Sequence, residues 1–133
     1  MAVLALLLGW RPGRYLTLEL AWALPPLALQ AAVGADVLWR RRHSLLALLL
    51  GLTLYLCAAD FTAVHAGVWT IDPAQSVGLL AGNVLPVEEI VFFLLTNSLI
   101  INGLTLAIAP ETRERLAALR SGARRSSPAQ RAT

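Results

Sequence analysis

Two adjacent glutamates, Glu88 and Glu89, lie near the start of a long apolar segment of this 133-residue chain. An ionised carboxylate deep in a bilayer costs about 2.5–3.5 kcal/mol on insertion scales, so an intramembrane acid is a candidate functional residue. Glu19 and Asp60 occupy two further apolar segments, which contain no lysine or arginine to pair with them. The four acids could line one cluster, and clustered carboxylates in surroundings of low polarity cannot all ionise. They would leave a protonated acid beside an ionised base, the arrangement that acid–base catalysis uses.

A purely structural role explains the same pair of glutamates. Pro86 fits the first turn of a helix, where its missing N–H costs nothing. Glutamates that follow it complement the positive end of the helix dipole. On this alternative, Glu88 and Glu89 only cap a helix at the outer membrane interface, and the residues alone leave both interpretations open.

Three long apolar segments must position these acids. The chain is 57% hydrophobic with a mean hydropathy of +0.65, and a bilayer core about 30 Å thick needs roughly 20 apolar residues per helical span. Short alternating segments typical of transmembrane β-strands do not occur in the sequence. We therefore predict an all-α, polytopic membrane protein with three transmembrane helices over residues 15–37, 44–64 and 84–109.

The arginines predict the orientation of these spans. Arg40, Arg41 and Arg42 fill the first loop and six more lie after residue 110, whereas residues 65–83 contain no arginine or lysine. The positive-inside rule then places the N-terminus outside and the C-terminus in the cytoplasm of a multi-pass protein of the cell membrane. A nucleic-acid partner is not expected despite the net charge of +3, because the arginines flank spans and have no interleaved aromatic residues.

Helical periodicity predicts which side chains face the interior of the bundle. In the first span, Glu19, Trp22, Pro26 and Gln30 share one face, and the Pro25-Pro26 pair is expected to kink the helix. In the second span, Thr53, Asp60 and Val64 are roughly aligned.

In the third span, Glu89 is expected to point toward neighbouring helices, together with Phe92 and Phe93. Glu88 lies about 100° away and is expected at a flank, toward a second chain. Aromatic ring faces near such acids could stabilise a cationic intermediate, although ordinary packing explains each ring equally well. The opposite, lipid-facing side is predicted to hold Ile90, Val91, Leu94 and Ile101.

Three parts of the chain follow from these patterns. Residues 1–14 form an N-terminal extension, residues 15–109 form the three-span domain, and residues 110–133 form an arginine-rich cytoplasmic tail. A short helix is predicted over residues 111–120 and disorder over residues 121–133. Three spans with polar faces bury little against each other, so we expect a partner chain or self-association within the lipid bilayer.

The run from Pro86 to Phe93, Pro-Val-Glu-Glu-Ile-Val-Phe-Phe, resembles a family signature. It is similar to the Pro-x-Glu-Glu-x-x-Phe-Phe motif of the non-flavin, heterodimeric or fused lycopene cyclases of carotenoid biosynthesis. Asp60, Trp69 and the Asp72-Pro73 pair precede it in the order seen in that family. The resemblance covers about residues 15–109.

This resemblance implies a three-helix half of a lycopene β-cyclase that works with a second, related three-span subunit. The implied reaction is a redox-neutral, acid–base isomerisation that closes the linear ends of lycopene into β-ionone rings. Glu88 and Glu89 are then candidates for acid and base in either order, with Asp60 in support. The implied substrate-binding residues are Phe92, Phe93, Trp69, Asp72, Pro86 and Glu19.

No cofactor or metal is expected. The sequence contains no Rossmann glycine fingerprint for a flavin or nicotinamide, and His43 and His65 are isolated rather than spaced as metal ligands. Three other functions stay open, namely a subunit of a C50 carotenoid cyclase, a non-catalytic partner that stabilises another cyclase half, and a proton-handling membrane subunit.

Overall fold

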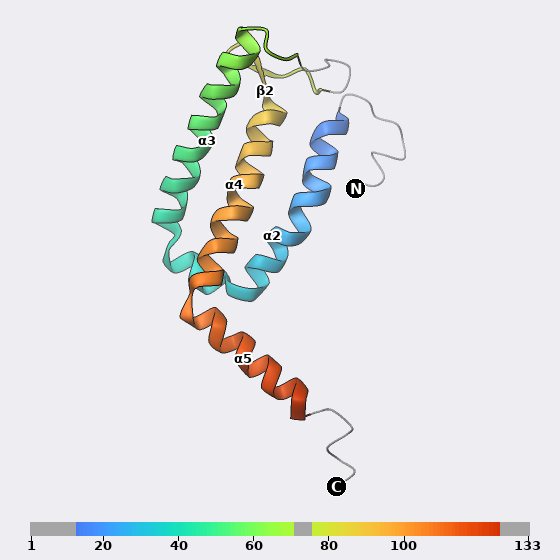
Figure 1. The fold of residues 1–133 in the computed structure, drawn as a ribbon. Coiled ribbons are helices and arrows are strands. Elements are labelled where there is room, and N and C mark those ends of the chain that lie inside the picture. Colours follow the sequence, from blue (N-terminus) through green and yellow to red (C-terminus); the bar gives the residue numbers. More distant parts are fainter. Residues whose placement is uncertain (1–12, 71–75, 126–133) are drawn as a thin grey trace.

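The computed structural model describes residues 13–70 and 76–125. Along the chain lie α2 (Arg14–Arg40), α3 (Arg42–His65), β1 (Leu80–Ala81), β2 (Leu85–Pro86), α4 (Val87–Ile108) and α5 (Pro110–Arg125). The helices α2, α3 and α4 are each long and apolar enough to cross a membrane. The predicted three-span helical fold is therefore confirmed (Figure 1).

Helix α4 is the centre of the bundle. It lies between α2 and α3, and each of these helices contacts α4 far more extensively than it contacts the other (Figure 1). A single residue, Arg41, joins α2 to α3. The third span therefore holds the first two together.

Helix α2 presents the predicted face to α4. Gln30 donates a hydrogen bond from Nε2 to the Leu99 carbonyl oxygen at 2.9 Å, and the Trp22 ring lies 6.4 Å from that of Phe92. The break in helical geometry occurs at Gly34 (φ −159°, ψ 42°) rather than at the predicted Pro25-Pro26 pair.

The break at Gly34 lies where α2 packs against Leu106 of α4. A Cβ atom at this position would collide with the side chain of Leu106. Leu106 belongs to a small core with Val37 and Ala109, which closes this end of the bundle. The missing side chain of Gly34 therefore lets α2 approach Leu106 of α4 at the point where α2 bends.

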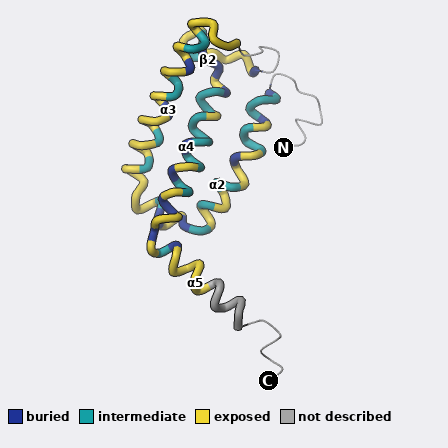
Figure 2. The backbone as a smooth tube through the Cα atoms, in the orientation of Figure 1, coloured by how far each residue is buried: buried dark blue, intermediate teal, exposed yellow. Residues whose placement is uncertain are grey.

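Helix α3 is mostly exposed, and Figure 2 shows exposed residues along much of its length. Its buried residues are the aligned pair Thr53 and Asp60, as predicted. Asn97 of α4 donates a hydrogen bond to the Thr53 hydroxyl group at 3.1 Å. This buried contact joins the two helices near mid-span.

The predicted orientation of α4 needs two corrections. Ile101, expected to face lipid, is 5% exposed, because α4 lies between α2 and α3. Glu88, expected at a flank toward another chain, is 4% exposed and lies inside this one. The exposed face instead holds Ile100, Leu104 and Ile108, which are spaced four residues apart.

A short antiparallel hairpin precedes α4 and was not predicted. Leu80 pairs with Pro86 and Ala81 with Leu85. Gly82 and Asn83 form the turn with φ values of 59° and 57°, which is the backbone of a type I′ turn. Strands of two residues are too short to show an alternating pattern, so the Gly-Asn pair was their only signal.

The tail forms one continuous helix, α5, which reaches Arg125, five residues beyond the predicted end. The prediction of disorder was wrong for residues 121–125, and residues 126–133 lie outside the described residues. Arg115 binds both carboxylate oxygens of Asp36, at 2.9 and 2.7 Å. These hydrogen bonds raise the pKa of the Arg115 guanidinium, so α5 is held to α2 by a charged pair.

Candidate acidic site

Glu88, in the first turn of α4, is bound to the loop that leads into the hairpin. Its Oε1 atom accepts a hydrogen bond from the Ser76 hydroxyl group at 3.0 Å and another from the Val77 backbone N–H. Its Oε2 atom is also buried and has no hydrogen-bond partner among the described residues. The loop therefore holds one carboxylate oxygen of Glu88, and the other oxygen is available for a further hydrogen bond.

The loop itself is fixed around this carboxylate. The Ser76 hydroxyl group, which is buried, accepts a hydrogen bond from the Gly78 N–H at 3.2 Å. Val87, at the start of α4, donates its N–H to the Leu79 carbonyl oxygen at 3.0 Å. Sequence reasoning missed Ser76 and Val77, because a serine in a loop of small residues has no distinguishing spacing.

Glu89 lies at the inner side of the same turn. It is near enough to Asp60 of α3 and to Glu88 for electrostatic interaction, and Glu19 of α2 interacts in the same way with both glutamates. The four acids, from three helices, therefore lie at the same end of the bundle. Within the described part of the chain, the ion pairs involve none of these four acids.

Asp60 is the acid contributed by α3, and it is 6% exposed. The Trp69 side chain, just after the end of α3, is its hydrogen-bond partner. Its Oδ2 atom is buried without a partner among the described residues, as is the Oε2 atom of Glu19. Asp72, the other predicted acid, lies outside the described residues.

Aromatic side chains extend from the acids toward the middle of the bundle. The Phe92 ring lies 5.8 Å from that of Phe93 in an edge-to-face arrangement and 6.4 Å from the Trp22 ring. Trp22 is 45% exposed and Phe92 is 36% exposed, so this aromatic wall is open on one side.

Two apolar pockets lie at the same end of the bundle as the acids. One of about 410 Å³ lies beneath the loop and is lined in part by Ser76 and by Pro86, which is buried. The other, of about 380 Å³, lies between α3 and the hairpin against Phe61 and Ile90. No three His, Cys, Asp or Glu side chains in the described ranges are grouped as metal ligands. The acids themselves line neither pocket. This end of the bundle nevertheless combines carboxylate oxygens that have no hydrogen-bond partner among the described residues with apolar space, which suits proton transfer to a hydrocarbon.

Several known proteins are similar in sequence to this chain over most of its length. A lycopene beta-cyclase of Halobacterium salinarum is 44% identical over 92 residues, which are 69% of this chain and 38% of the archaeal protein. A bifunctional lycopene cyclase/phytoene synthase of Phaffia rhodozyma is 40% identical over 85 residues, 61% of this chain and 13% of the fungal one. A bifunctional protein of the same kind from Gibberella fujikuroi is 38% identical over 93 residues, 69% of this chain and 16% of its own length.

The chain belongs to the lycopene cyclase family. The family expected from the Pro86–Phe93 signature is thus confirmed. The chain spans well under half the length of the lycopene cyclases that it matches. No family profile and no solved structure matches it.

Proposed function

We propose that this protein cyclises the ends of lycopene by acid–base catalysis in the membrane. The observation that carries the proposal is the placement of four carboxyl groups at one end of the bundle, beside an aromatic wall, in a relative of lycopene cyclases. No cation is paired with these acids in the described structure. A hydrocarbon offers no polar group to bind, so the catalytic parts it requires are a proton donor, a proton acceptor and an apolar slot.

The proposed reaction begins when a protonated carboxyl group gives its proton to the terminal alkene. The neighbouring double bond attacks the resulting cation and closes a six-membered ring. A carboxylate then removes a proton from the ring, which forms the ring double bond. One proton enters and one leaves, so no oxidant, reductant or other co-reactant is needed.

The surroundings of the two glutamates suggest different roles. Glu89 lies among Glu19, Asp60 and Glu88 and is followed one turn later by the aromatic wall, so we assign proton transfer to it. Glu88 has one oxygen occupied by Ser76 and Val77, so we assign it the positioning of the loop, with its second oxygen as the partner in proton exchange. Asp60 and Glu19 would share the proton with this pair.

A second, related half is proposed to complete the site. The aromatic wall is open at Trp22 and Phe92, and α3 exposes an apolar surface that includes Leu54 and Tyr55, 72% and 70% exposed. A cell-membrane location is proposed, with the acids toward the outer side and the arginines of the first loop toward the cytoplasm. The absence of arginine and lysine from residues 65–83 supports this orientation.

Expression in lycopene-accumulating cells tests the function directly. The chain is produced alone and with related three-span halves, and the pigments are separated by chromatography. We expect pigments with β-ionone rings when a matching half is present. Unchanged lycopene with every such half, while the protein is found in the membrane fraction, would contradict the proposal.

A further inference from the structure

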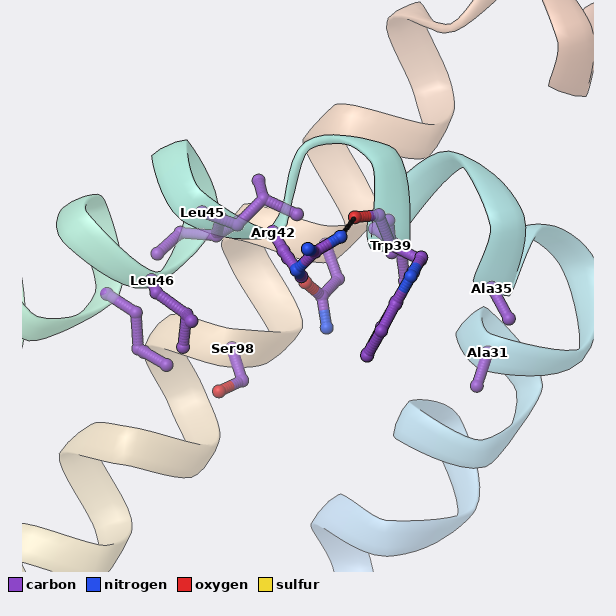
Figure 3. Close-up of a pocket in the computed structure, with 11 residues that line it drawn as sticks. Ala31, Ala35, Trp39, Arg42, Leu45, Leu46 and Ser98 are labelled. Carbon is purple, nitrogen blue, oxygen red and sulfur yellow. Dashed lines mark hydrogen bonds between the residues drawn. The ribbon is translucent and has the colours of Figure 1, made fainter.

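A third pocket lies at the opposite end of the bundle from the acids. It has a volume of about 410 Å³ and is lined by α2, α3 and α4 where α2 and α3 separate. Figure 3 shows Ala31 and Ala35 on one side, Leu45 and Leu46 on the other, and Arg42 between them. The two alanines of α2 are too small to fill the space facing α3, so the cleft stays open.

Arg42 is the charged residue of this pocket, and its position is fixed. Its guanidinium carbon lies 4.6 Å from the centre of the Trp39 ring, and Nη1 donates a hydrogen bond to the Trp39 carbonyl oxygen at 3.2 Å (Figure 3). A guanidinium group has five N–H donors, so most of them remain for a ligand.

The charge of Arg42 is not balanced by the neighbouring residues. Arg40 is paired with Asp36 and Glu111, whereas the ion pairs of the described residues include none for Arg42. Helix α3 begins at Arg42 without an acidic residue in its first turn. The Arg42 charge is therefore free to bind an anion directly beside an apolar cleft.

We propose that this cleft binds an anionic phospholipid, with the phosphate group on Arg42 and an acyl chain against Ala31 and Ala35. A small inorganic anion would not use the apolar walls, and a neutral lipid would not use the arginine. Basic pockets between transmembrane helices at the cytoplasmic side suit such head groups, and a tryptophan such as Trp39 is common at that depth. The site is separate from the acids and does not depend on the proposed cyclase activity.

Quenching of tryptophan fluorescence by brominated lipids tests the proposal. The full chain is reconstituted in phosphatidylcholine bilayers that contain either brominated phosphatidylglycerol or brominated phosphatidylcholine at equal fraction. We expect stronger quenching by the anionic lipid, and the excess should disappear in Trp39→Phe, which removes the reporter. Equal quenching by the two lipids in the unaltered chain would overturn the proposal.

Two variants and a matched control separate a specific site from diffuse charge. Arg42→Gln should weaken the apparent affinity for the anionic lipid about fivefold, whereas Arg41→Gln, which removes a neighbouring charge outside the pocket, should change it little. Ala35→Leu keeps the charge but fills the cleft, and it should also abolish the excess quenching. Equal losses in Arg41→Gln and Arg42→Gln, with unchanged helical circular dichroism, would show a general surface effect. Excess quenching that survives in Ala35→Leu would refute the acyl-chain pocket.

Discussion

The two ends of the helical bundle use charged residues in opposite ways. At the hairpin end, Glu88 and Asp60 are buried, and the four acids form no ion pair in the described structure. At the other end, Asp36 is exposed and is bound by both nitrogens of the Arg115 fork. An exposed, paired acid stabilises the arrangement of helices. A buried acid without a cation costs stability, which is expected of residues retained for chemistry.

Among substitutions at the two ends of the bundle, replacement of Glu89 by glutamine should have the largest effect on ring formation. The amide keeps the size of the side chain but cannot exchange the proton, so we expect ring formation to fall about 100-fold or more. Pigment chromatography, with the protein level in the membrane fraction measured in parallel, gives the result. Asp36→Asn is the matched control and should cyclise normally. If both variants lost ring formation to a comparable extent, the acids at the two ends would not differ in function.

Truncation of Glu88 should mainly affect the stability of the loop. Glu88→Ala leaves the Val77 N–H and the Ser76 hydroxyl group without their acceptor, a loss of about 1–3 kcal/mol. The free energy of unfolding in detergent measures this loss. Glu88→Gln keeps an acceptor oxygen and should recover most of the stability. If the alanine and glutamine variants are equally stable, the hydrogen bonds to the loop have no structural role.

The buried contact between α3 and α4 lies between the two ends and should have a smaller effect. Asn97→Ala removes the hydrogen bond to Thr53, and such interhelical bonds contribute about 0.6–2 kcal/mol in membranes. Thr96→Val is the control, because the Thr96 hydroxyl group bonds only within its own helix in the described structure. Unfolding in detergent should therefore respond to Asn97→Ala more than to Thr96→Val.

Loss of the charged pair at α5 should have the smallest effect. Arg115→Gln should accelerate hydrogen exchange in α5 without changing ring formation, because exposed ion pairs contribute little. Added salt should produce part of the same change in the unaltered protein. Arg113→Gln, which removes only a long hydrogen bond to the Ala107 carbonyl oxygen, is the control. A loss of cyclisation in Arg115→Gln would show that the two ends are coupled.

The sequence predicted the elements of this fold better than their contacts. Long apolar runs identified all three spans, and helical periodicity identified the faces of α2 and α3 that carry Gln30 and Asp60. These are local properties that follow from the helical repeat. The gathering of the acids followed as well, because each lies near the same end of its span.

The failures came from contacts between distant segments. Ile101 was expected to face lipid because nothing local shows that α4 lies between two helices. The break of α2 lies at Gly34, which packs against Leu106, 72 positions later in the numbering of the chain. Glu88 was placed at a flank because its hydrogen bonds to Ser76 and Val77 depend on the conformation of a loop with no regular repeat.

The central position of α4 also constrains the order of events during synthesis. The ribosome completes α2 and α3 before α4, yet these first two helices contact each other little and Arg41 alone links them. Their polar groups Gln30 and Thr53 enter the bilayer before the α4 residues that form hydrogen bonds with them. The nascent chain therefore passes through a stage with unsatisfied polar groups in lipid. Arrival of the third span ends that stage and assembles the acids in the same step.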